Sequence, residues 1–253
     1  MTWIVKHLAE LQTAFLLLTR FPVGKLTSNN PKLADGLWAF PIVGCVIGGI
    51  IAGCYIVTSQ FMPNSLAAAV VGLTVGLLCT GAIHEDGLAD CADGFGGGQN
   101  REKKLAIMKD SAIGTYGTLA LIMVIGLRIY MLSSLPPIPE IVVPIIICAV
   151  ISRFAMVGYL CFLPAARQEG LGSQASTENK FSFFLSATVT LPAFYMSLFG
   201  LIYVVIAILV VAVLWGIVAK YQLGGQTGDV CGAGQLLSET TGWVTLVSIY
   251  SVL

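Results

Sequence analysis

Long apolar runs separated by short polar segments dominate the chain. A membrane-spanning helix needs about 20 mostly apolar residues. Seven runs come near that length: 37–58, 65–83, 117–135, 141–163, 183–200, 201–219 and 236–253. Only helices and closed barrels satisfy all backbone hydrogen bonds inside lipid. The pattern therefore predicts an all-α polytopic membrane protein, a bundle of about seven transmembrane helices that forms one domain over residues 1–253.

The N-terminal segment has a different pattern. Apolar residues recur there at helical spacing, at Trp3, Ile4, Leu8, Leu11, Phe15 and Leu18, and Lys6, His7 and Glu10 interrupt them. This arrangement is typical of an amphipathic helix at the membrane interface, which we expect over residues 1–20. A short first span is the alternative. The segment has no small-residue cleavage site, so we do not expect a cleaved signal peptide.

Composition supports a membrane protein. The chain is 57% hydrophobic and 10% charged, with a mean hydropathy of +0.88, whereas soluble domains carry about 25% charged residues. Its formal net charge is zero and it has no basic tail, which argues against nucleic acid as a partner. The seven cysteines form no CxxC pair, so we expect reduced core residues rather than disulfides or a zinc site.

Outside the apolar runs, lysine and arginine residues are confined to alternate loops. They precede the first run and follow the second, fourth and sixth, whereas 59–64, 136–140 and the turn near Gly200 carry none. Two spans separate each basic loop from the next, so the basic loops share one side of the membrane. By the positive-inside rule that side is the cytoplasm. The polar segments 84–117 and 220–235 fall on it and are predicted to be cytoplasmic active-site loops.

The most acidic part of the chain begins where the second apolar run ends. Residues 85–94 hold four of the 13 acidic residues. If the segment is helical, Asp86, Asp90 and Asp93 stand at i, i+4 and i+7 on one face. Stacked carboxylates repel one another unless a hard divalent cation binds between them. The spacing therefore predicts a divalent metal site.

A glycine-rich run follows the acidic stripe directly. The backbone N–H groups of Gly94 and 96–98 are candidates to cradle phosphate oxygens, and a plain flexible loop is the alternative. Lys109 and Asp110 add a cation and a carboxylate farther along the same segment. A metal held by the carboxylates would bridge to the phosphate.

A second polar cluster separates the sixth and seventh runs. Residues 223–235 combine five glycines with Gln226, Thr227 and Asp229. The cluster is either a second contact for a diphosphate or an interhelical turn in which Asp229 is the helix N-cap. The segment 164–180, with Arg167, is likewise either a lid with substrate contacts or a solvated linker.

Two arginines fall inside predicted spans. A cation at that depth is expensive and normally has a partner, so Arg128 and Arg153 are expected to pair with acidic residues or with a substrate phosphate. A pairing that only holds helices together is the structural alternative. His84 adjoins the acidic stripe as a candidate general base or metal ligand, or as a helix-mouth residue with a carboxylate partner.

Three segments resemble the signature motifs of one enzyme family. They are HEDGLADCADG at 84–94, IMKDSAIGTYG at 107–117 and LGGQTGD at 223–229. Shorter matches are TRFP at 19–22, Ser152-Arg153 and EGLG at 169–172. The matches run in order along essentially the whole chain. The chain is thus similar to the cobalamin synthases, the adenosylcobinamide-GDP ribazoletransferases.

This resemblance implies a reaction at a diphosphate. α-Ribazole, or its 5′-phosphate, attacks the phosphate attached to adenosylcobinamide in adenosylcobinamide-GDP; GMP leaves, and adenosylcobalamin or its phosphate forms. Mg²⁺ is the implied cofactor, and the cytoplasmic membrane of a bacterium or archaeon is the implied location. A homo-oligomer, or association with other enzymes of the corrinoid pathway, is compatible with the sequence.

Residue roles follow from this chemistry as predictions. The predicted Mg²⁺ ligands are Asp86, Asp90, Asp93, Asp110 and Asp229. Glu85 and His84 are candidates to take the proton from the attacking hydroxyl. Lys109, Arg153 and Arg20 are candidates to hold phosphate oxygens, and Gly96, Gly97, Gln226, Thr227 and Gly228 complete the predicted substrate site.

Two other classes of membrane protein also use acidic clusters. The motif of CDP-alcohol phosphotransferases has an arginine soon after its first Asp-Gly, and residues 86–90 contain no arginine. Prenyltransferases favour two Asp-rich motifs, whereas the second polar segment here, 225–229, holds one Asp. Cation-coupled transporters place such residues near the midplane, often in paired repeats. Here the carboxylates cluster at one predicted face and no internal repeat is visible.

Overall fold

The computed structural model describes residues 3–25, 31–175, 180–198 and 200–251. Its α-helices are α1 (Trp3–Leu18), α2 (Phe40–Ser59), α3 (Ser65–Thr80), α4 (Ile83–Gly97), α5 (Arg101–Ile107), α6 (Thr115–Ser134), α7 (Val142–Phe162), α8 (Leu171–Ala175), α9 (Phe181–Ser197), α10 (Ile202–Leu223) and α11 (Gly228–Tyr250). Two 3-10 helices, η1 (Leu33–Ala39) and η2 (Pro139–Ile141), precede α2 and α7. The described ranges contain one isolated bridge, Ala165 to Gln226, and no β-strand. The all-α prediction is confirmed.

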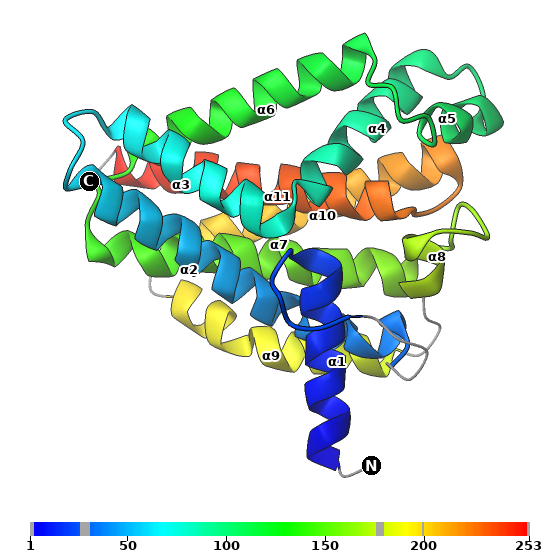
Figure 1. The fold of residues 1–253 in the computed structure, drawn as a ribbon, viewed down its shortest axis with the longest axis horizontal. Helices are drawn as coiled ribbons and strands as arrows, with labels where there is room; N and C mark the ends of the chain where they lie inside the picture. The colour runs from blue at the N-terminus through cyan, green and yellow to red at the C-terminus, as the bar shows by residue number, and fades with distance from the viewer. Residues whose placement is uncertain (1–2, 26–30, 176–179, 199, 252–253) are drawn as a thin grey trace.

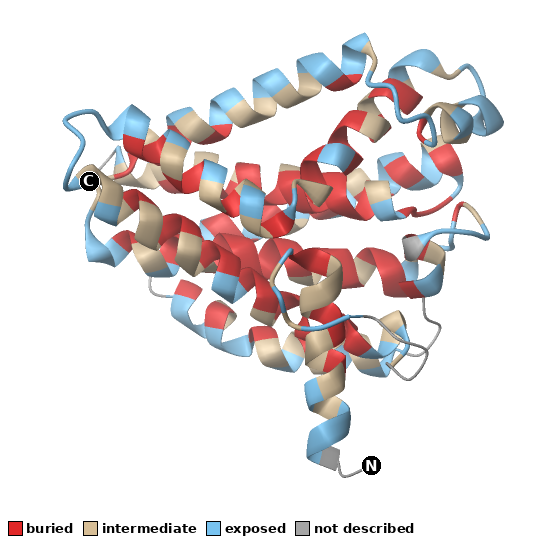
Figure 2. Cartoon of the chain, viewed as in Figure 1, coloured by how far each residue is buried: buried red, intermediate tan, exposed pale blue. Residues whose placement is uncertain are grey.

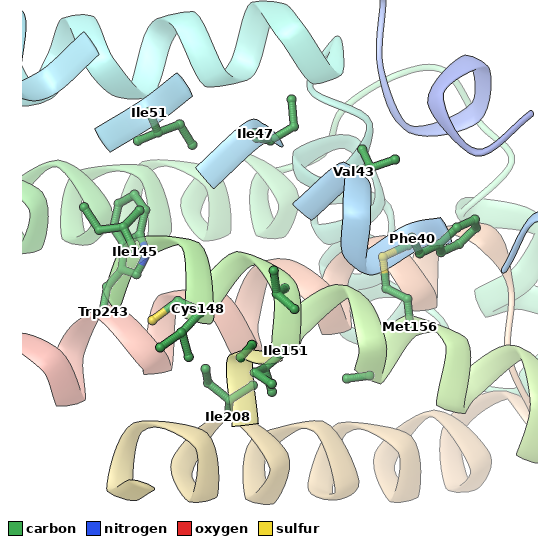
Figure 3. Close-up of a cluster of buried hydrophobic side chains, with 14 of the residues drawn as sticks. Phe40, Val43, Ile47, Ile51, Ile145, Cys148, Ile151, Met156, Ile208 and Trp243 are labelled. Atoms are coloured by element: carbon green, nitrogen blue, oxygen red, sulfur yellow. The ribbon is translucent and has the colours of Figure 1, made fainter. Parts of the chain in front are cut away.

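Helix α7 lies at the centre of the bundle, in contact with α2, α9, α10 and α11 (Figure 1). Of its most apolar stretch 72% is buried, against 22% for α6. Side chains from α2, α7, α10 and α11 interlock in this core (Figure 3). The outward face of α6 is exposed (Figure 2), with apolar side chains such as Ile122 and Met123. An exposed apolar face of this kind suits contact with lipid.

Small residues let α2 approach α7 closely. A Cβ added at Gly44 would lie 2.5 Å from the carbonyl oxygen of Ala149, and one at Gly48 would lie 3.0 Å from the Ala149 Cβ. Membrane helices pack most closely where such residues face each other, since attraction there depends on van der Waals contact.

Four helical segments are long and apolar enough to span a membrane. They are Leu33–Ser59, Thr115–Ser134, Pro139–Phe162 and Ile202–Leu223. The bent pair α3 and α4 would make a fifth, and α9 is a shorter apolar helix. The predicted count of about seven stays a prediction, because α9 is short and α11 begins with polar residues. The predicted elements 1–20, 183–200 and 236–253 each include residues outside the described ranges, namely 1–2, 199 and 252–253.

The chain turns sharply between α3 and α4, whose axes differ by 87°. Gly81 and Ala82 both adopt left-handed backbone conformations, with φ of +67° and +55°. The side chain of Arg20 occupies the space that a Cβ at Gly81 would need. Segment 84–117 was predicted to be a loop, but most of it is helical. Helix α4 follows the turn directly. Helix α5 begins after Asn100, whose side chain caps it by accepting from the Lys103 N–H at 2.9 Å.

The polar connections gather at the two ends of the bundle. Segments 98–114, 163–170 and 224–227 lie at one end, and 60–64 and 135–138 lie at the other (Figure 1). The basic segments 98–114 and 163–170 lie at the same end (Figure 1), which agrees with the predicted grouping. That all the basic loops share one side of a membrane, and which side this is, stay predictions. Helix α1 runs across the direction of the long helices (Figure 1); its place at a membrane interface stays a prediction.

The close approach of α2 to α7 gives a stability test. We expect Gly44→Ala to lower the free energy of unfolding by about 1–3 kcal/mol, because the added methyl overlaps the Ala149 carbonyl. Thermal unfolding of the purified protein in detergent measures the change. Gly53→Ala in the same helix is the matched control, since a Cβ there meets no atom within 4 Å. Equal melting temperatures for the two variants would contradict the packing argument.

Candidate functional site

A pocket of about 360 Å³ opens between α1, α4, α7 and the N-terminal end of α11. Its polar lining includes Arg20, His84, Asp86, Arg167, Glu169, Gln226, Thr227 and Asp229. Its apolar lining includes Leu17, Leu18, Phe40, Ile83, Met156 and Leu160. Residues from the first and third signature motifs thus meet in one cavity.

Glycines join the two acidic segments. A Cβ at Gly87 would lie 2.7 Å from the carbonyl oxygen of Asp229, and one at Gly232 would lie 3.2 Å from the Cα of His84. Because neither position tolerates a larger side chain without movement, α4 and α11 are held backbone against backbone. This contact brings the carboxylates of Asp86 and Asp229 to the same cavity.

The first turn of α11 is capped by Thr227. Its hydroxyl accepts from the Val230 N–H at 3.2 Å and also lies 3.2 Å from the Asp229 carboxylate. The N-cap is therefore Thr227, and the alternative that Asp229 caps the helix is wrong. Asp229 instead forms an ion pair with Arg167. Burial raises the pKa of the Asp229 carboxyl, and the Arg167 guanidinium opposes that rise.

Arg167 is the main residue that the sequence did not select. It reaches the pocket because two backbone hydrogen bonds join its loop to the start of α11: Ala166 N–H donates to the Gln226 carbonyl and Gln226 N–H donates to the Pro164 carbonyl, both at 2.8 Å. The buried Gln226 side chain also donates to the Gly172 carbonyl at 3.1 Å. Gln226 thus organises the loop. The sequence signals for Arg167 were its place in a polar segment on the same side and the EGLG match that begins two residues after it.

The predicted acidic stripe divides between two positions. Asp86 lines the pocket, and Asp90 is near enough to Asp86 and Asp229 for their charges to repel. Asp93 faces elsewhere and accepts from the N–H groups of Gly114 at 2.7 Å and Gly117 at 2.9 Å. These are free donors at the start of α6, so Asp93 holds α6 to α4.

Other predicted residues lie away from the pocket. Asp110 is exposed and accepts from the Ala112 N–H at 3.1 Å. Lys109 lies 3.9 Å from the carboxylate of Glu169, which does line the pocket. Gly96 and Gly97 are helical, and Gly96 faces the Tyr116 ring. Helical N–H groups donate to carbonyls four residues earlier, which does not fit the predicted phosphate cradle.

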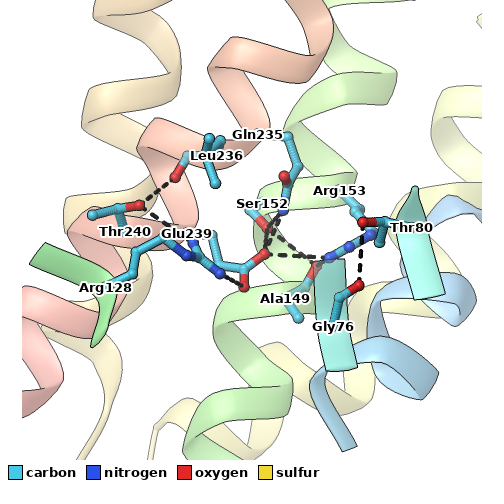
Figure 4. A network of polar contacts seen from close by, with 10 residues as sticks. All are labelled: Gly76, Thr80, Arg128, Ala149, Ser152, Arg153, Gln235, Leu236, Glu239 and Thr240. Atoms are coloured by element: carbon cyan, nitrogen blue, oxygen red, sulfur yellow. Dashed lines mark hydrogen bonds and ion pairs between the residues drawn. The ribbon is translucent and has the colours of Figure 1, made fainter. Parts of the chain in front are cut away.

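A buried charge cluster lies behind the pocket, formed by His84, Glu85, Arg128, Arg153 and Glu239. The Glu239 carboxylate binds Arg128 at 2.9 Å and Arg153 at 3.3 Å and also accepts from Gln235 (Figure 4). Arg128 also lies over the ring of Trp243, 4.2 Å from its centroid. The interpretation that the two arginines pair with an acidic residue is confirmed.

Glu85 and Arg153, both predicted to act in catalysis, belong to this buried cluster. They line a small separate cavity behind the pocket, together with Arg128 and Glu239. His84 lines both cavities, and its Nε2 has no hydrogen-bond partner within the described ranges. Of the predicted acid–base residues, His84 is thus the one that the main pocket reaches.

Residues 10–247 match the family described as cobalamin-5-phosphate synthase. The chain belongs to that family. A Sinorhizobium adenosylcobinamide-GDP ribazoletransferase is 37% identical over 89% of this chain and 90% of its own length. The Bradyrhizobium diazoefficiens and Shewanella woodyi enzymes of the same name are 36% and 37% identical, over 92% and 82% of this chain and 90% and 83% of their own. No solved structure matches.

The family match extends over all three signature segments. It also includes α6, α7 and most of α11, which carry the charge cluster. The pocket and the cluster behind it therefore both lie inside the region that defines the family.

The charge cluster gives a second stability test. We expect Glu239→Gln to cost about 3–5 kcal/mol of folding free energy, because two buried guanidinium groups lose their counter-charge. Thermal unfolding in detergent measures the loss. Glu140→Gln, at an exposed position near the other end of the bundle, should change nothing. A Glu239→Gln protein as stable as the wild type would show that the cluster does not hold the helices.

Proposed function

We propose that this protein is an adenosylcobinamide-GDP ribazoletransferase that acts in cobalamin synthesis. It joins adenosylcobinamide-GDP to α-ribazole or its 5′-phosphate and releases GMP. The observation that carries the proposal is the membership of the chain in this family. Relatives of that name match it over about nine tenths of both chains. The convergence of two acidic motifs on one pocket supports it. A transporter or another phosphotransferase is not favoured.

The pocket offers groups suited to a diphosphate. The guanidinium groups of Arg20 and Arg167 line it, and such groups bind phosphate oxygens through paired N–H donors. The start of α11 adds backbone N–H groups at a positive helix end. We assign phosphate binding to these residues and not to Arg153, which is buried and lines only the small cavity behind the pocket.

The carboxylates fit a hard cation. Asp86, Asp90 and Asp229 supply oxygen donors whose mutual repulsion is offset by one guanidinium, that of Arg167. Among the described residues, no three acidic, histidine or cysteine side chains are placed to hold one metal ion together. Mg²⁺ usually binds through one or two carboxylates and completes its shell with phosphate and water, and Asp86 and Asp229 would supply those carboxylates. When bound, Mg²⁺ would neutralise charge on the diphosphate.

Proton removal from the attacking ribose hydroxyl is assigned to His84. His84 lines both the pocket and the small cavity behind it, and its Nε2 is buried with no hydrogen-bond partner among the described residues. A general base must come within hydrogen-bond reach of the proton that it takes. Glu85 is absent from the lining of the pocket and lines the small cavity behind it with Arg128 and Arg153, so we do not assign it this role.

An assay of GMP release by the purified protein in lipid tests the function. It also tests whether Asp86 serves the pocket while Asp93 only holds α6 to α4. Removal of Mg²⁺ with a chelator should abolish release. We expect Asp86→Asn to lower turnover about 100-fold or more, as loss of an electrostatic partner in a reaction at phosphate does. Asp93→Asn should lower thermal stability and leave the Mg²⁺ requirement unchanged, because Asp93 contacts α6. A raised Mg²⁺ requirement in Asp93→Asn would contradict this division.

We further propose that the pocket opens toward the cytoplasm from the cytoplasmic membrane. The basic loops at the pocket end of the bundle support this orientation. Alkaline phosphatase, which is active only outside the cytoplasm, should be active when inserted at Pro63 and inactive when inserted at Asn100. The reverse result would contradict the orientation.

A further inference from the structure

The pocket has an apolar half that the phosphate chemistry does not use. Leu17 and Leu18 of α1, Phe40 at the start of α2, and Met156 and Leu160 of α7 form it. Phe40 and Met156 belong to the main buried core (Figure 3). Because core side chains are close-packed and hold their rotamers, this half of the cavity has a fixed shape.

We infer that this apolar half, the base subsite, binds the flat benzimidazole base of the nucleoside acceptor. The inference rests on the proposed function. The ribose then lies toward His84 and Asp86, at the border of the polar half, and its hydroxyl faces the diphosphate held near Arg167. The subsite residues touch the substrate and determine specificity for the base.

Size favours the nucleoside over the corrinoid as the occupant. A cavity of about 360 Å³ is near the lower limit for pockets that enclose one small molecule, about 300–1,000 Å³. A corrin ring with its amide side chains, an adenosyl group and GDP is far larger. The corrinoid therefore places only its diphosphate at the polar half and keeps its ring outside.

Polarity favours the benzimidazole over the guanine of GDP. Guanine carries several donors and acceptors around its edge, and burying them without partners is costly. The base subsite offers apolar side chains: Leu17, Leu18, Phe40, Met156 and Leu160. Benzimidazole presents mainly carbon to its surroundings.

The test fills or empties the base subsite and follows each substrate separately. We expect Leu160→Phe and Met156→Ala to raise the KM for α-ribazole about tenfold or more, as a misfit of one or two carbons in an apolar pocket does. The KM for adenosylcobinamide-GDP should change less than about twofold, because the polar half is untouched. The base of α-ribazole carries two methyl groups that unsubstituted benzimidazole lacks. In the Leu160→Phe variant, the riboside of unsubstituted benzimidazole should therefore have a KM much closer to that of the wild type.

Met131→Ala is the matched control, because Met131 is buried in the core and does not line the pocket. It should lower stability without altering either KM. α-Ribazole alone should raise the melting temperature of the wild type and of Met131→Ala, and raise that of Met156→Ala less.

The outcomes separate the two hypotheses. A rise in the KM for adenosylcobinamide-GDP alone, or no change in either KM, would overturn the base subsite while the function stands. Failure of α-ribazole to stabilise the wild type would also overturn the subsite. A wild-type protein that binds α-ribazole but releases no GMP would overturn the proposed function and leave the subsite standing.

Discussion

The ion pairs of Glu239 are the interaction on which the rest of the structure depends. One carboxylate on α11 holds guanidinium groups from α6 and α7 in an apolar core. A buried cation without a partner costs several kcal/mol, so none of the three helices can shift alone. Helix α4 is tied to the same unit through Gly87 and Gly232. The positions of the polar residues that line the pocket therefore depend on the buried ion pairs behind it.

Much of the fold and part of the site could be predicted from the sequence. Long apolar runs correspond to α2, α6, α7 and α10, because lipid leaves the backbone few alternatives. The pairing of Arg128 and Arg153 followed from the cost of charge at depth, and helical spacing placed Asp86 beside Asp90. The resemblance of three motifs identified the family.

The remaining features depend on contacts between distant segments. Asp93 has the spacing of a metal ligand, but its carboxylate instead accepts hydrogen bonds from the N–H groups of Gly114 and Gly117. Arg167 enters the pocket through the bridge between Ala165 and Gln226, which no local pattern indicates. Gly96 and Gly97 suggested a loop, yet both are helical, and Gly96 packs against Tyr116. Propensity is a weak guide where tertiary contacts compete.

The turn at Gly81 and Ala82 has a consequence for how the chain can change in length. Connections between helices usually tolerate insertions and deletions. Here one added or missing residue would rotate α4 by about 100°, since a helix has about 3.6 residues per turn. Gly87 would lose its register against Asp229, and a different side chain would replace Asp86 in the pocket. A substitution at the exposed Asp86 is compatible with the fold, whereas a shift in spacing is not.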